Sequence, residues 1–199
     1  MSPYDGTRIY EIVTRLEARE ATPVLEPKRA WDPDLTVEIH GASIPDLFGE
    51  RVVVDVMCAE CVRSGLLLWN DALDASHVVS QSIDTTTGSY WHGIMHRREP
   101  DYGNSKYWFR NVGTHETMSG LPGAALTIAD AMGNGSDALN GFKQALAGDT
   151  AWDPYRFVDW CESAAAGRIS EDAIALLRSI QLAEIRALLE YSFSCACRE

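Results

Sequence analysis

The chain has 199 residues, 46% of them hydrophobic and 23% charged, and a formal net charge of −12 at pH 7. These values fit a single globular domain over residues 1–199 with an apolar core. The acidity argues against nucleic acid and anionic membrane as main partners, because polyanion binding needs a basic face. No stretch approaches the roughly 18 apolar residues of a membrane span, and the N-terminus lacks the apolar segment of a signal peptide. We therefore expect a cytoplasmic protein.

The N-terminal part is expected to contain one helix and one extended arm. Apolar residues at helical spacing predict a helix that begins near Thr7 and ends before Pro23. These residues are Ile9, Ile12, Val13 and Leu16. The proline-rich stretch 22–42 predicts an extended arm over the surface, with a short strand at 35–41. His40, inside that strand, is expected to be structural.

The segment 45–82 predicts a long central helix, or two helices joined near Gly65 or Asn70, because it is apolar on most of its circumference. Towards its end the apolar stripe becomes polar. Asp74 and His77 lie three residues apart and therefore share a helical face. This change predicts a core that opens into a pocket.

The later segments also predict helices, except for the glycine-rich stretch 133–150, which we expect to be a mobile loop. The predicted helices cover 89–99, 105–113, 121–132 and 154–167, and a long final helix begins near Ser170. The sum is an all-α fold. We expect a bundle of six to eight helices around the long central helix, with an extended N-terminal arm.

The five cysteines, an odd number, fit free thiols in a reducing compartment. They are Cys58, Cys61, Cys161, Cys195 and Cys197. A zinc site built from the Cys58/Cys61 and Cys195/Cys197 pairs requires two distant parts of the chain to meet. We expect buried free thiols instead.

Residues 88–115 differ from the rest of this acidic chain: GSYWHGIMHRREPDYGNSKYWFRNVGTH. The stretch holds three of the five histidines, namely His92, His96 and His115. It also carries four cations, namely Arg97, Arg98, Lys106 and Arg110. Positive charge, imidazole and aromatic surface gathered in one place predict a binding site.

Metal-free acid–base catalysis on a small polar or anionic substrate is the function that we favour from these residues. His92 and His96 then act as general base and acid near neutral pH. Asp74 and Glu99 orient them or hold a substrate amine. His77, beside Asp74, is a further candidate for the acid or base. The cations Arg97, Arg98, Arg110 and Lys106 bind a carboxylate, sulfate or phosphate group. Because successive helical residues point about 100° apart, at most one of the tandem arginines is expected to face the pocket.

Four aromatic residues are candidates for the pocket wall: Tyr90, Tyr102, Tyr107 and Trp108. For any single one of them, packing between helices is the better expectation. The phenols of Tyr102 and Tyr107, which have polar neighbours, are best suited to donate a hydrogen bond to a leaving group or an oxyanion.

A divalent metal ion is the alternative. His92, His96 and Glu99 follow the spacing H-x-x-x-H-x-x-E, which places them on one helical face. His77 or Asp74 from the neighbouring helix then completes the ligand set. A third possibility is a non-catalytic subunit whose aromatic and basic stretch binds a partner subunit or a second copy of the chain.

The stretch resembles a block found in an uncharacterised family of helical bacterial proteins, W-H-x-x-x-H-R-R-E-x-D-Y-x-N-x-K-Y-W-x-R-x-x-G. A D-A-S-H segment precedes it and a helix similar to DPYRFVDWCE follows, so that the resemblance covers residues 66–162. The family implies no assigned activity. Such a protein fits a tailoring enzyme of natural-product biosynthesis, a lyase or cyclase that needs no cofactor. Aziridine formation with intramolecular loss of sulfate is one such reaction.

Overall fold

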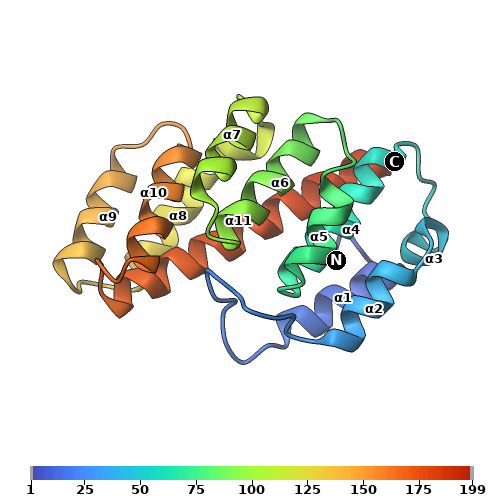
Figure 1. Cartoon of the computed structure of the whole chain (residues 1–199), viewed down its shortest axis with the longest axis horizontal. Helices are drawn as coiled ribbons and strands as arrows, with labels where there is room; N and C mark the ends of the chain where they lie inside the picture. The colour runs from blue at the N-terminus through green and yellow to red at the C-terminus, as the bar shows by residue number, and fades with distance from the viewer. Residues whose placement is uncertain (1, 198–199) are drawn as a thin grey trace.

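The computed structural model describes residues 2–197 and is all-helical (Figure 1). Eleven α-helices, one short 3-10 helix (Glu116–Ser119) and no strand occur among these residues. The α-helices are α1 (Arg8–Glu17), α2 (Pro33–Gly41), α3 (Ile44–Phe48), α4 (Val56–Trp69), α5 (Leu73–Ser80), α6 (Thr86–Arg98), α7 (Tyr102–Val112), α8 (Leu121–Ala131), α9 (Asp137–Ala147), α10 (Pro154–Ala165) and α11 (Glu171–Ala196). The all-α bundle is confirmed, with more helices than the six to eight expected. None of the described helices is long and apolar enough to cross a bilayer.

The helix around which the others pack is α11, the last and longest, with 26 residues. It runs along the long axis of the molecule, against α4 near one end and α8 near the other (Figure 1). Its predicted start is confirmed, because Ser170 is the N-cap residue and acidic residues follow in the first turn. Buried residues recur every three or four positions from Ala173 to Ala196, so that a continuous stripe faces the core.

The expected central helix over 45–82 is divided into α3, α4 and α5. The break between α4 and α5 falls at Asn70, one of the two expected positions, and not at Gly65. Asp71 follows with a positive φ of 61°, which ends the α4 helix. Helix α5 folds back on α4, where the hydroxyls of Ser64 and Ser76 lie 3.0 Å apart. The central position belongs to α11, because only a helix of that length contacts both ends of the molecule.

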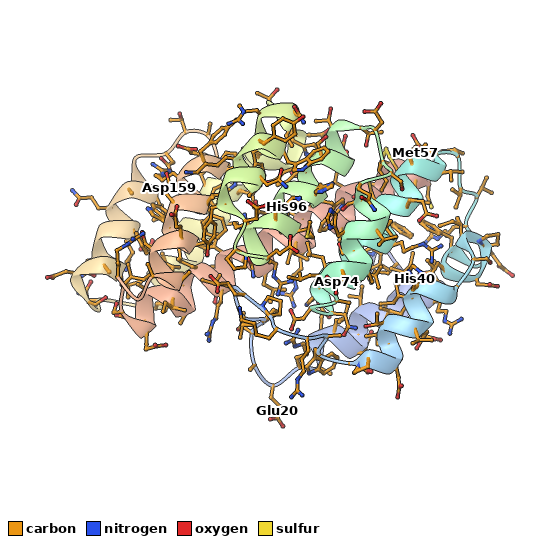
Figure 2. The ribbon with its side chains drawn as sticks, viewed as in Figure 1. Glu20, His40, Met57, Asp74, His96 and Asp159 are labelled. Carbon is orange, nitrogen blue, oxygen red and sulfur yellow. A yellow bond between two sulfur atoms is a disulfide. The ribbon has the colours of Figure 1, made fainter. Side chains whose placement is uncertain are left out.

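The strand expected at 35–41 is wrong, because these residues belong to helix α2. Asp32 accepts a hydrogen bond from the backbone N–H of Leu35, and Pro33 occupies the first helical turn. These two start signals outweigh the strand preference of the β-branched residues that follow. His40 lies exposed on α2, well away from His96 (Figure 2).

The extended part of the arm is therefore shorter than expected, and buried polar side chains hold it against the core. Arg98 and Gln181 donate hydrogen bonds to the carbonyl of Val24, at 3.0 and 3.3 Å. Asn70 donates to the carbonyl of Asp32 at 2.7 Å. The arm between these two anchors is fixed in place, and it forms part of a cavity wall.

The mobile loop expected at 133–150 is also wrong, because the stretch contains α9. Ser136 caps this helix and donates its hydroxyl to the Asp172 carboxylate at the start of α11, at 2.8 Å. Leu139 and Leu146 are buried, and their spacing of seven residues places them on one face. The capping residue and these two leucines outweigh the glycines of the segment.

Two cysteines from distant parts of the chain, Cys58 on α4 and Cys195 on α11, form a disulfide. The expectation of free thiols is therefore wrong for this pair. The same segments also meet in an isolated β-bridge between Val53 and Cys197. The free cysteines are Cys61, Cys161 and Cys197.

We predict that reduction of the Cys58–Cys195 disulfide lowers the free energy of unfolding by about 2 to 5 kcal/mol. The bridge joins residues 137 positions apart, so that its loss releases a large loop in the unfolded chain. Urea unfolding with and without reductant measures the effect. The double variant Cys58→Ser/Cys195→Ser is the control, and its curve should not respond to reductant. An unchanged midpoint for the unsubstituted protein would contradict the prediction.

Candidate functional site

Three imidazole rings converge between α5 and α6. His92 and His96 are one turn apart on α6, with ring centroids 4.7 Å apart and planes inclined by 23°. His77, on α5, presents its ring edge-on to both, with centroids 4.8 Å from His92 and 5.1 Å from His96. One ring nitrogen from each residue lies within 4.8 Å of the others. The three residues, hereafter the histidine cluster, are those that the sequence placed on neighbouring helices.

Helix α7 covers one side of the histidine cluster with two side chains. Trp108 stacks on His92, with ring centroids 4.0 Å apart and planes inclined by 15°. The side-chain amide nitrogen of Asn104 lies 3.0 Å from Nε2 of His96. Trp108 was among the predicted pocket residues. Asn104 was not, because an asparagine near the start of a helix carries no distinctive signal of binding.

Glu99 immediately follows α6 and contacts the cluster from the other end. Its Oε2 lies 3.2 Å from Nδ1 of His96. A carboxylate in this position fixes the tautomer of a histidine, so that Nε2 is left as the basic nitrogen. Glu99 therefore pairs with His96 and not with His92. Asp74 precedes His77 by one turn on α5 and is exposed.

The two histidines of α6 are buried, and their environment favours the uncharged ring. Burial and the neighbouring rings of His96 and His77 lower the pKa of His92 to about 4. Burial and His77 also lower the pKa of His96, although Glu99 acts in the opposite direction. Nδ1 of His92 is buried with no hydrogen-bond partner among the described residues. Such an unpaired nitrogen is uncommon, because buried polar atoms are nearly always hydrogen-bonded.

Arg97 points away from the histidine cluster and into the core. Its guanidinium lies 2.5 Å from Oε2 of Glu184 on α11, and both side chains are fully buried. Tyr90 donates to the other oxygen of the same carboxylate at 3.0 Å. The guanidinium also lies over the ring of Phe157, 4.5 Å from its centroid. Arg97 and Tyr90 are therefore structural residues, which corrects the expectation that they bind substrate.

Arg98 is also fully buried, and its charge is paired within the protein. It forms an ion pair with Asp71 and donates to the carbonyls of Leu68 and Val24. Asp71 is shared with Arg19, at 2.8 Å. The expectation of Arg98 as a free anion-binding side chain is corrected in the same way. Sequence reasoning missed Asp71 and Glu184, whose buried carboxylates gave no local signal.

The remaining predicted residues contact other parts of the protein. Lys106 pairs with a carboxylate of α10. Arg110 lies over the ring of Tyr107, 5.7 Å from its centroid, and both residues are exposed. Tyr102 donates to Glu26 of the arm at 2.6 Å. The structure thus brings together the histidines, Glu99 and Trp108 from the predicted set, while the cations lie elsewhere.

A cavity of about 430 Å³ extends from Glu99, and none of the three histidines lines it. Its lining comes from the arm at 27–30, from the α4–α5 junction and first turn of α5 at 71–75, and from the α6–α7 junction at 98–100. Glu99 lines this cavity and also contacts His96, so that one side chain is common to the cavity and the cluster. The volume is typical of a small-molecule site.

Comparisons with protein-family models, with curated proteins and with solved structures find no match to this chain. The geometry of the histidine cluster and the cavity is therefore the basis on which a function is argued.

We predict that Glu184→Ala destabilises the fold by about 3 to 5 kcal/mol, because it leaves the Arg97 guanidinium buried without its carboxylate. Replacing both partners, as Arg97→Met/Glu184→Met, should restore most of the loss, since no charge is then left unpaired. Urea unfolding of the two variants measures this. A Glu184→Ala protein within about 1 kcal/mol of the unsubstituted protein would contradict the prediction.

We also predict that the metal-free protein loses stability as the pH falls from about 6.5 to about 4. His92 has a lowered pKa of about 4 in the folded state, so the unfolded chain binds the proton first as the pH falls. This proton binding lowers the free energy of the unfolded chain relative to the folded protein. The loss from His92 alone should be about 3 kcal/mol. Urea unfolding across this pH range, in the presence of chelator, measures the slope. The variant His92→Gln should have a shallower slope, and an equal slope would argue against the assignment.

Proposed function

We propose that the histidine cluster binds a divalent transition metal ion, with zinc the best fit, and that the protein is a metal-dependent enzyme acting on a small polar substrate. The observation that carries the proposal is the convergence of three imidazole nitrogens within 4.8 Å of one another. Two come from successive turns of α6 and the third comes from α5. Imidazole is the most common nitrogen ligand of zinc, copper and iron in proteins.

The ring geometry is close to that of a metal site. Zinc–nitrogen bonds of about 2.0 to 2.1 Å in a tetrahedral site place ligand nitrogens about 3.3 Å apart. The present upper separation of 4.8 Å closes to this value by small rotations of side chains that already face one another. The unpaired, buried Nδ1 of His92 also gains a partner if that ring turns towards an ion.

The charge state of the cluster supports the same proposal. A metal ion binds only the neutral form of imidazole, and the lowered pKa values of His92 and His96 keep this form at neutral pH. The Glu99 carboxylate on Nδ1 of His96 is the kind of outer contact that orients a metal-bound histidine.

Three protein ligands leave a coordination position open, which is typical of catalytic zinc sites. An ion there lowers the pKa of bound water or polarises a carbonyl group of a substrate. The adjoining cavity provides room for that substrate, and Glu99 stands at the junction. We therefore infer hydrolysis of a small molecule as the reaction class.

Metal-free acid–base catalysis remains the second candidate, and one observation favours it. The hydrogen bond between Glu99 and His96 would orient that imidazole as a general base equally well without an ion. The anion-binding part of this mechanism lacks Arg97 and Arg98, since both are paired inside the core. The metal-binding experiment separates the two candidates.

We predict that the untagged protein, loaded with zinc and dialysed, retains about one ion per chain by mass spectrometry of its metal content. Alanine at His77, His92 or His96 should each weaken zinc affinity at least about a hundredfold, since each removes a ligand. Glu99→Gln should weaken it by about 10 to 100-fold through the orientation of His96.

The matched control is His40→Ala, which removes an exposed histidine on α2 and should leave zinc affinity unchanged. Loss of zinc by this variant, or its retention by all three cluster variants, would refute the metal centre. Zinc-dependent cleavage of an activated ester such as para-nitrophenyl acetate, abolished by His92→Ala, tests the hydrolytic part. A zinc-loaded protein with no such activity would reduce the proposal to a structural metal site.

A further inference from the structure

The cavity beside the histidine cluster is lined by charges of both signs that the protein leaves without partners. Lys28 and Arg29 line it from the arm, and Asp74 lines it from the first turn of α5. All three residues are exposed, and within residues 2–197 their side chains form no ion pair and no side-chain hydrogen bond. Glu99 adds a second carboxylate, whose one hydrogen bond is to His96. The cavity therefore offers two free cations and two carboxylates to a ligand.

Two guanidinium groups and one carboxylate meet beside the α4–α5 junction. The single carboxylate of Asp71 is shared between the guanidinium groups of Arg19 and Arg98. Arg98 is fully buried, and its Nε has no hydrogen-bond partner among the described residues. No side chain caps the first turn of α5, so that its N–H groups are available. The Nε of Arg98 and these N–H groups are donors without an acceptor among the described residues.

A ligand with charge of a single sign does not fit this lining. A plain anion satisfies Lys28 and Arg29 but is repelled by Asp74 and Glu99, and a plain cation meets the reverse problem. A charged side chain that loses its water when a ligand binds needs a group of opposite charge on that ligand. A ligand with a positive and a negative end satisfies both sets at once.

We propose that the cavity binds a small zwitterion of the amino-acid class, such as a dipeptide. Its ammonium group lies on Asp74 and Glu99, and its carboxylate lies on Lys28 and Arg29. A cavity of about 430 Å³ holds a molecule of this size with room for its side chains.

The position of the acidic residues connects this ligand to the histidine cluster. Glu99 contacts His96, and Asp74 is one turn from His77 on the same face of α5. An ammonium group held by these carboxylates places the adjoining amide bond nearest to the histidines. The role of the dipeptide as a substrate rests on the proposed metal centre. The binding of the dipeptide in the cavity does not depend on a metal ion.

The test is isothermal calorimetry with metal-free protein in chelator, with L-alanyl-L-alanine as the probe. Two analogues each remove one charge, namely the N-acetylated dipeptide and the dipeptide amide. We expect binding with one ligand per chain, and affinity for each analogue weaker by at least about tenfold. Asp74→Asn should weaken binding of the dipeptide by a similar factor. The same variant should not weaken binding of the N-acetylated analogue, which has no ammonium group. The double variant Lys28→Gln/Arg29→Gln should weaken binding of the dipeptide by a similar factor. It should not weaken binding of the dipeptide amide, which has no carboxylate.

Glu20→Gln is the control, because it removes an exposed carboxylate at the far end of the arm, away from Asp74 (Figure 2). This variant should bind the dipeptide as the unsubstituted protein does. No heat of binding with the folded protein at up to about 10 mM dipeptide would overturn the proposal. Equal affinity for all three ligands would overturn it as well. Because no metal is present in this assay, its result is independent of whether the histidine cluster binds zinc.

Discussion

The arrangement of the site depends on the buried ion pair between Arg97 on α6 and Glu184 on α11. A guanidinium and a carboxylate that are both fully buried must face one another, because either alone would be an uncompensated charge in the core. The pair therefore fixes the rotation of α6 about its own axis. With about 100° per residue, the side of α6 that carries His92 and His96 is turned away from α11 and towards α5 and α7.

A second buried pair acts at the end of the same helix. Arg98 joins Asp71, in the short connection between α4 and α5, and thereby fixes where α5 begins relative to α6. Asp71 adopts a positive φ of 61°, a conformation that costs a non-glycine residue free energy and persists only where surroundings enforce it. The two guanidinium groups on this carboxylate provide that enforcement. The rotation of α6 and the start of α5 together place His77 against the other two rings.

The tandem arginines thus contribute to the site without belonging to it as ligands of a substrate. They are the most basic feature of an acidic chain, and their charge is neutralised inside the fold. What the site presents is a set of imidazoles next to the carboxylates of Glu99 and Asp74, within a protein of net charge −12. Such a field favours the approach of cations, both metal ions and ammonium groups, over anions. Lys28 and Arg29 are the local exception. The part of the cavity that they line prefers the negative end of a ligand.

Local patterns in the sequence determined what depends on neighbouring residues. The helical periodicity indicated the all-α class, and the capping residue Ser170 indicated the start of α11. The four-residue spacing of His92 and His96 placed both on one helical face. Two local interpretations were wrong because competing signals had to be weighed. At α2 the capping residue outweighed residues that favour a strand, and at α9 it outweighed glycines that favour a loop. These errors concern the relative strength of local effects.

Only the tertiary structure decided the rest. Arg97 and Glu184 are 87 positions apart, and Cys58 and Cys195 are 137 apart, so that no local pattern pairs them. The histidine cluster combines the predicted α6 pair with His77 because α5 folds back at Asp71, and the cavity exists because the arm is fixed across that junction. A sequence records which groups are available along the chain, whereas burial decides which must be paired and with whom. The partners of the buried charges, and through them the site, follow from packing alone.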